Sequence, residues 1–181
     1  MTEFSRLYRL DSLSAEPIRV DIEAGPEERQ ALARRFGLAA LDALAAEAEL
    51  RRAGDCVCAA VQMRARVTQS CVASGEPVEA GVEEEFHIDF RPLPAGARPD
   101  EEVELGEGEL DVIFYEGGAI DLGEAVAQSL LLGLDPYPRS PAAEEALREA
   151  GVKSEEEARA ESSPFAALAA LKGKSGDDDG R

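Results

Sequence analysis

The residue types that most often carry out catalysis are scarce in this chain and gather in one stretch. Among its 181 residues there is a single histidine, His87. Alternation along a predicted strand places Glu85, His87 and Asp89 on one side, where they are candidates for acid–base catalysis or metal binding. A solvated strand face has the same pattern, and the sequence contains no nucleophile elbow, Walker loop or dinucleotide fingerprint. We therefore predict no catalytic site, and an enzyme that uses these three residues is the alternative.

The three cysteines, Cys56, Cys58 and Cys71, do not form a recognisable site. An odd number of cysteines without an export signal disfavours a disulfide framework. Structural zinc sites usually show paired spacings such as CxxC, which are missing here. We expect free thiols, no bound metal and no cofactor. Because the sequence also has neither a signal peptide nor a long apolar run, it predicts a cytoplasmic protein without membrane contact.

Charge is the most distinctive property of the sequence, with a formal net charge of -19. Residues 81–161 hold 22 acids and six bases, whereas residues 1–80 hold 13 acids and ten bases. Because nucleic acid is bound mainly by cations, the middle of the chain should repel it and favour a basic partner. A direct contact with RNA or phosphate must come from the first 80 residues. The candidates for it are Arg51, Arg52, Arg64 and Arg66.

Hydrophobic periodicity predicts an α+β fold, with an antiparallel β-meander or a partly closed barrel and a few packed helices. Alternating segments at 4–10, 18–22, 55–68, 82–90 and 110–115 indicate strands. Capping signals predict helices at 26–36 and at 121–134, the second opened by a capping box from Asp121 to Glu124. Residues 38–52 are rich in alanine, and we divide them at about Ala45 into a helical part and a strand. Arg64 and Arg66 are expected to lie opposite glutamates of the next strand.

Composition divides the chain into four parts. We expect an α+β globular domain at 1–138, an acidic flexible segment at 139–161, a short docking helix at 162–174 and a disordered tail at 175–181. The docking helix starts with a serine cap and Pro164, and Phe165, Leu168 and Leu171 share one stripe. So short a helix must dock to be stable, either on its own domain or on a partner. Pro164, Phe165, Leu168 and Leu171 are therefore the predicted partner-binding residues.

The order of these features resembles the YceD family, the large ribosomal RNA subunit accumulation proteins, across roughly residues 1–174. A cysteine precedes the turn of the meander, an acidic loop follows, and Asp121-Leu122 opens an apolar helix. That helix ends at Leu134-Asp135-Pro136-Tyr137-Pro138. The family's closing motif is similar to Asn-Pro-Phe-Ala-x-Leu-x-x-Leu-Lys, and in residues 163–172 only the asparagine is changed, to Ser163.

Two positions depart from the family pattern. Many members carry a CxxC where this chain has Cys71-Val72-Ala73-Ser74, and some carry a later histidine and cysteine where it has Arg139-Ser140. A serine hydroxyl replaces neither thiolate nor imidazole as a zinc ligand. If those positions bind metal in relatives, this chain has lost the site. The acidic, cysteine-poor sequence resembles the alphaproteobacterial branch of the family.

The resemblance implies a non-enzymatic role in bacterial ribosome biogenesis, in the accumulation of large-subunit ribosomal RNA. Genes of the family lie beside that of a small, basic large-subunit ribosomal protein. The implied partner is a basic large-subunit ribosomal protein or a pre-ribosomal particle. Direct binding of pre-ribosomal RNA through Arg51, Arg52, Arg64 and Arg66 is the alternative within the same function.

Overall fold

The computed structural model describes residues 3–94 and 111–153. The predicted docking helix at 162–174 and the tail at 175–181 lie outside these residues. The elements run, in chain order, β1 (Leu7–Arg9), the 3-10 turn η1 (Leu10–Ser12), β2 (Ile18–Glu23), α1 (Pro26–Phe36), β3 (Ala40–Ala53), β4 (Cys56–Ser70), β5 (Pro77–Pro92), β6 (Val112–Tyr115), β7 (Ala119–Asp121), α2 (Leu122–Gly133) and α3 (Ala143–Glu149).

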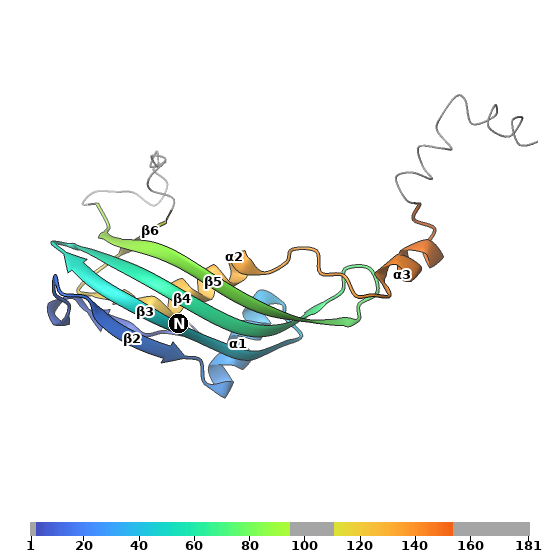
Figure 1. Ribbon diagram of the computed structural model, residues 1–181, viewed down its shortest axis with the longest axis horizontal. Helices are drawn as coiled ribbons and strands as arrows, with labels where there is room; N and C mark the ends of the chain where they lie inside the picture. Colours follow the sequence, from blue (N-terminus) through green and yellow to red (C-terminus); the bar gives the residue numbers. More distant parts are fainter. Residues whose placement is uncertain (1–2, 95–110, 154–181) are drawn as a thin grey trace, which may run out of the picture.

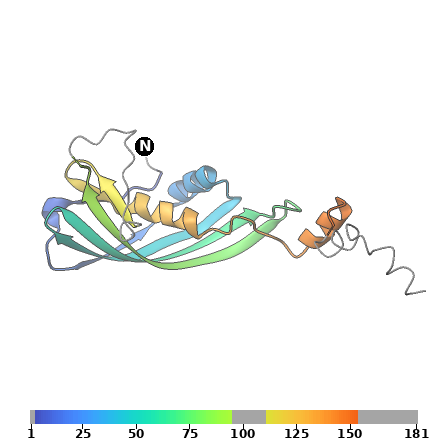
Figure 2. The same ribbon diagram turned by 90° about the horizontal axis from the view of Figure 1, so that it is seen from above.

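An open five-stranded sheet in the order β2-β3-β4-β5-β6 is the body of the molecule (Figure 1). Strands β2 to β5 form an antiparallel meander, while β6 adds to β5 in parallel over Asp89–Pro92 only. The α+β class and the meander are therefore confirmed, and the sheet does not close into a barrel. The sheet curves, and α1 and α2 both lie on its concave side (Figure 2).

Strand β3 corrects the division predicted at Ala45. A single strand covers Ala40–Ala53, and Leu44, Ala46, Ala48 and Leu50 are buried while the residues between them are exposed. The alanines favour a helix only in isolation, whereas here each backbone group can pair with β2 or β4. Tertiary pairing has overridden the local preference.

The N-terminal segment also differs from the predicted strand at 4–10. Only Leu7–Arg9 pairs, with β7, and Leu10–Ser12 forms a 3-10 turn. Phe4 is fully buried, with the Arg6 guanidinium 4.5 Å from its ring centroid. The apparent alternation in the sequence thus reflects one buried ring and one ion-paired arginine rather than a long strand.

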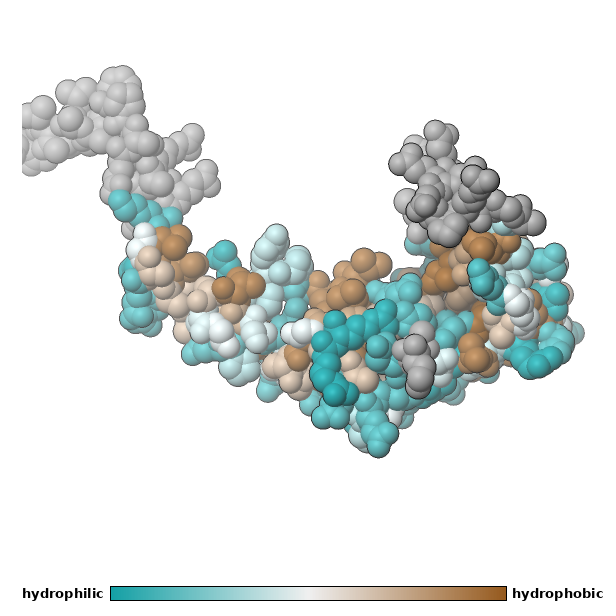
Figure 3. Space-filling view, turned by 180° about the vertical axis from the view of Figure 1, so that it is seen from behind, coloured by the Kyte–Doolittle hydropathy of each residue, from teal (hydrophilic) through white to brown (hydrophobic). Residues whose placement is uncertain are grey.

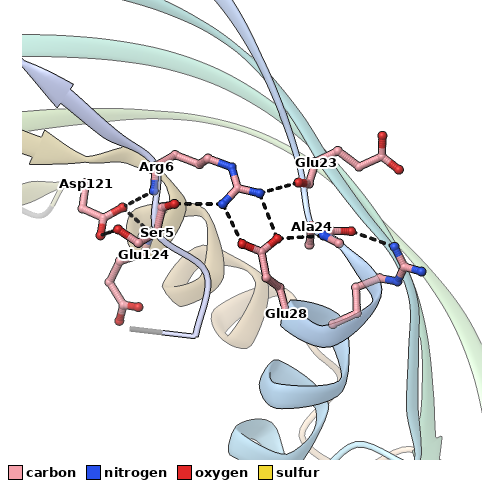
Figure 4. Close-up of polar contacts among 9 residues, drawn as sticks. Ser5, Arg6, Glu23, Ala24, Glu28, Asp121 and Glu124 are labelled. Carbon is pink, nitrogen blue, oxygen red and sulfur yellow. Dashed lines mark hydrogen bonds and ion pairs between the residues drawn. The ribbon is translucent and has the colours of Figure 1, made fainter. Parts of the chain in front are cut away.

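Arg6 joins the N-terminal segment to α1 and β2 (Figure 4). Its guanidinium donates two hydrogen bonds to the Glu28 carboxylate, at 2.7 and 2.8 Å, and a third to the Glu23 carbonyl. Glu28 also accepts the Gly25 N–H at 2.7 Å, which starts α1. These bonds lower the pKa of Glu28, with the Arg6 hydrogen bond as the main cause. The site is half-buried, so the paired charges contribute more than an exposed ion pair does.

Helix α2 packs against the same N-terminal segment. Asp121 caps it by accepting the Glu124 N–H at 3.2 Å, and also accepts the Ser5 hydroxyl at 2.6 Å. The predicted capping box is incomplete because the Glu124 carboxylate pairs with Arg35 instead. A Cβ on Gly123 would lie 2.8 Å from the Arg6 nitrogen, so only glycine fits this approach.

The core fills the space between the sheet and the two helices. It is built from the inward side chains of β3 and β4, with one apolar stripe from each helix. Its largest fully buried members include Leu44, Leu50, Val57, Val61, Met63 and Val67 from the strands and Leu32, Leu122 and Leu130 from the helices. Because alternate side chains point inward, the remaining side chains of each strand point to the opposite face of the sheet.

The start of the predicted flexible segment contains α3 (Ala143–Glu149), with Ala143 buried. The domain boundary at residue 138 itself remains a prediction. No helix in the ranges that the structure describes is both long and apolar enough to cross a membrane.

Candidate partner-binding surface

No described helix covers the convex face of the sheet, called here the outer face (Figure 2). Many of its exposed side chains are charged. It consists of the residues of β2 to β5 that alternate with the core. Its paired positions hold eight carboxylates and five arginines. They are Asp21, Glu23, Glu47, Glu49, Glu79, Glu83, Glu85 and Asp89, and Arg19, Arg51, Arg64, Arg66 and Arg91.

A row of like charges crosses the middle of the outer face. Asp21 lies opposite Glu47, which lies opposite Gln62, which lies opposite Glu85. Neighbouring strands are only about 4.8 Å apart, so directly opposed carboxylates destabilise the sheet. The fold does not need this row, because its members are exposed. A row that costs stability and is presented to solvent suits a cationic ligand.

Small residues leave shallow hollows on either side of this row. Ala45 lies in one hollow of about 510 Å³, and Ala60 lies in another of about 310 Å³. Asp21, Glu47 and Gln62 line both, so the row forms the ridge between them. The outer face is therefore not flat. Its hollows can receive lysine or arginine side chains of a partner next to the carboxylates.

The sequence placed the acidic surface in residues 81–161, and the structure extends it. Asp21, Glu47 and Glu49 belong to the same face although they come from the first 80 residues. They were missed because the acidic charge was counted by segment of the chain and not by face of the predicted strands. The signal that identifies Glu47 and Glu49 is the alternation of charged residues with apolar ones from Glu47 to Arg51, and Arg19 and Asp21 alternate in the same way with Ile18, Val20 and Ile22.

The four predicted arginines do not form one patch. Arg51, Arg64 and Arg66 are exposed on the outer face, with Arg64 opposite Glu83 and Arg66 opposite Gly81. Arg52 faces the other side, where its guanidinium donates to the carbonyls of Leu10 and Gly54. The predicted pairing with glutamates therefore holds in register for Arg64 and fails for Arg66. Three of the four predicted arginines therefore share the outer face, where they lie among eight carboxylates.

Glu85, His87 and Asp89 lie along β5 on the outer face, as the alternation predicts. His87 lines a hollow of about 400 Å³ with Arg51, Cys58 and Asp89. Burial, with help from Asp89, raises the pKa of the Cys58 thiol, so Cys58 stays protonated and weakly nucleophilic. In the described ranges, no three histidine, cysteine or acidic side chains gather closely enough to hold a metal ion.

Cys71, Ser74 and Ser140 come together beyond the end of the β4–β5 hairpin. The hydroxyls of Ser74 and Ser140 are 3.0 Å apart, and Ser140 also donates to the Glu76 carboxylate at 2.8 Å. Hydrogen bonds from the Ser140 backbone, then from Ser74, lower the pKa of the buried Cys71 thiol to about 6. Cys71, Ser74 and Ser140, three of the positions that were compared with the family's cysteine and histidine pattern, thus converge in space. The two serine hydroxyls bond to one another and to Glu76.

The predicted partner-binding residues Pro164, Phe165, Leu168 and Leu171 lie outside the described residues. Their assignment remains a prediction.

Comparison with known proteins gives one match. Residues 59–172 match the model of the family described as "Large ribosomal RNA subunit accumulation protein YceD". Neither the curated proteins nor the solved structures include a match to this chain. The matched range begins within β4 and takes in β5, the Cys71 cluster and α2, together with the apolar segment near the C-terminus. Since this range is well over half of the 181 residues, the chain belongs to the YceD family.

Proposed function

We propose that this protein is a non-enzymatic factor in the biogenesis of the large ribosomal subunit. In this role it supports the accumulation of large-subunit ribosomal RNA by binding a basic ribosomal protein, free or within a pre-ribosomal particle. The family description supports the process, and the outer face supports the mode of action. The protein would act in the cytoplasm, where the subunit is assembled.

The outer face is the observation that carries the proposal. It presents eight carboxylates against five arginines, and two of those arginines already have a carboxylate nearby: Arg19 is within 3.8 Å of Glu49, and Arg91 is within 3.6 Å of Asp89. Ribosomal proteins with cationic segments aggregate on RNA nonspecifically. An anionic surface of this kind shields such a segment by electrostatic competition and speeds its capture.

Affinity capture at two salt concentrations tests the proposal. At low salt the full chain should enrich a basic large-subunit protein or a pre-ribosomal particle, and high salt should release it because exposed charges are screened. Neutralising the central row with Asp21→Asn, Glu47→Gln and Glu85→Gln should abolish the capture.

A matched control variant distinguishes an effect of the outer face from an effect of the protein's net charge. Glu27, Glu116 and Glu145 are exposed and lie away from the outer face, so their replacement by glutamine changes the net charge equally. This variant should still capture the partner. The proposal is wrong if the wild type enriches no ribosomal component at low salt, or if both variants lose capture to the same extent.

Direct binding of pre-ribosomal RNA is the second candidate, supported by the exposure of Arg51, Arg64 and Arg66 on the outer face. Reversing the charges of Arg64 and Arg66 to glutamate distinguishes the two. RNA binding would collapse, because each lost phosphate contact reduces affinity and its salt dependence. Binding of a basic protein would stay unchanged or become stronger.

A further inference from the structure

A hydrophobic groove lies between the C-terminal half of α2 and β5, on the concave side of the sheet. Its volume is about 250 Å³, and its walls include Phe86, Ile88, Ser129, Leu132 and Gly133. A cavity of roughly 150 Å³ lined by apolar groups is enough to bind a benzene ring. The groove therefore has room for a large aromatic or aliphatic side chain.

An exposed leucine of α2 stands at the groove, beside the polar residues Glu84, His87 and Asp111. Leu132 is 87% exposed, and its neighbour Leu131 adds a second apolar side chain that is 48% exposed. In Figure 3, hydrophobic side chains gather midway along the molecule, where α2 ends. Contiguous apolar surface of this kind usually marks a contact site.

The groove lies where β6 and α2 together leave part of β5 uncovered. In the described part of the chain β6 pairs with β5 only from Asp89 onward, so no strand covers the edge before that residue. On the other side α2 approaches so closely that a Cβ on Gly133 would lie 3.2 Å from Val82. Helix α2 therefore packs directly on the sheet at Val82, and the groove lies farther along β5, beside Phe86 and Ile88.

We propose that the apolar segment at residues 164–172 of the same chain docks in this groove, with Phe165 in the hollow. Phe165, Leu168 and Leu171 repeat at the spacing of one helical stripe, which matches a hydrophobic groove beside a helix. Lys172 follows the stripe, and Glu84 and Asp111 stand among the groove residues, so the charges are complementary.

The length of the intervening chain permits this docking. Ser140 bonds to Glu76 at the end of the hairpin, and nine residues of β5 separate Pro77 from Phe86, about 30 Å. Helix α3 is about 10 Å long. The Val152 N–H bonds to the Leu147 carbonyl, so residues 150–152 fold back onto its last turn and do not extend it. Lys153 is the last described residue, and the 12 residues from it to Phe165 reach about 40 Å when extended.

This contact has a consequence for partner binding. Helix α2, which forms one wall of the groove, lies on the concave side of the sheet, and the outer face is on the convex side (Figure 2). A docked segment therefore leaves the outer face free, but its own apolar stripe cannot contact a partner at the same time. The inference does not depend on the proposed function, since it concerns the isolated chain.

Photo-crosslinking of the purified full-length protein tests the proposal. A benzophenone amino acid at position 132 should crosslink to residues 162–174 within the monomer, as read by mass spectrometry of the monomeric fraction. The same group in place of Leu7, which is 68% exposed and belongs to β1, should not. Crosslinks only between two copies, or none to 162–174, would overturn the proposal.

Hydrogen exchange provides a second measurement that needs no unnatural residue. A short helix is unstable alone in water, so slow exchange at residues 165–171 requires a docking surface. Leu132→Glu should accelerate that exchange by about tenfold or more, while Leu7→Glu should leave it unchanged. Equal exchange rates in the wild type and in Leu132→Glu would contradict the contact.

Discussion

The two faces of the sheet are made of the same four strands, yet they differ in burial and in charge. On the concave face almost every side chain of β3 and β4 is buried against α1, α2 and the N-terminal segment. On the outer face the side chains are exposed and include directly opposed carboxylates. One side of each strand is thus committed to the core, while the other side is free for the partner binding that we propose. Substitutions on the two faces should therefore affect different measurements.

The largest effect is expected on the concave side, from Gly123→Ala. The new Cβ would lie 2.8 Å from the Arg6 nitrogen and from the Phe4 carbonyl, so the N-terminal segment must move away from α2. We expect a loss of about 3 kcal/mol in the free energy of unfolding, measured by urea denaturation. Gly118→Ala is the control, since nothing lies within 4 Å of its Cβ. Equal stability of the two variants would refute the close packing.

Arg6→Gln should have the next largest effect. It removes the paired bonds to Glu28 and the contact over the Phe4 ring, for a loss of about 2 kcal/mol. Arg9→Gln is the control, because its ion pair with Asp11 is exposed and should contribute nothing measurable.

The ion pair of Arg6 and Glu28 also predicts a dependence on pH. Arg6 lowers the pKa of Glu28 below its ordinary value of 4.5, so the carboxylate stabilises the folded state fully above that pH. This contribution disappears as the pH falls through the lowered pKa. The difference in stability between wild type and Arg6→Gln should therefore shrink below pH 4.5. A difference that stays constant into acid would show that the ion pair does not contribute.

On the outer face we expect a substitution to raise the free energy of unfolding instead of lowering it. Glu47→Gln removes the repulsion with Asp21 and should stabilise the protein by about 0.2–1 kcal/mol while weakening the capture of a basic partner. Denaturation and capture at low salt measure the two effects on the same sample. Glu27→Gln should change neither, because Glu27 is exposed on α1 and lies apart from the row. A loss of stability in Glu47→Gln would show that the row supports the fold.

The smallest effect is expected from His87→Ala. His87 is exposed on the outer face, opposite Ala60, so the change in stability should stay within about 0.5 kcal/mol. Capture of the partner should also be nearly unchanged, since the carboxylates carry the attraction. Complete loss of function in a complementation assay, with the fold intact, would instead favour the enzyme that uses Glu85, His87 and Asp89.

The sequence predicted well wherever local signals were strong. Helix α1 begins at Pro26 and ends before Gly37, whose φ of 67° is one that glycine adopts easily. Strands β4 and β5 alternate over long stretches, so their exposed and buried faces follow from the pattern. Prediction failed at β3, where alanines obscure the alternation, and at Arg52, whose direction depends on that register.

The sequence by itself determined the two-sided character of the strands, the charge of the molecule and the motifs that mark its family. These are local or summed properties, so no contact between distant residues is needed to read them. Only the tertiary structure decided that Asp21, Glu47 and Glu85 form one row, and that α2 leaves a groove beside Phe86. Both depend on strand register and on how closely a helix approaches a sheet, which packing across the whole chain fixes.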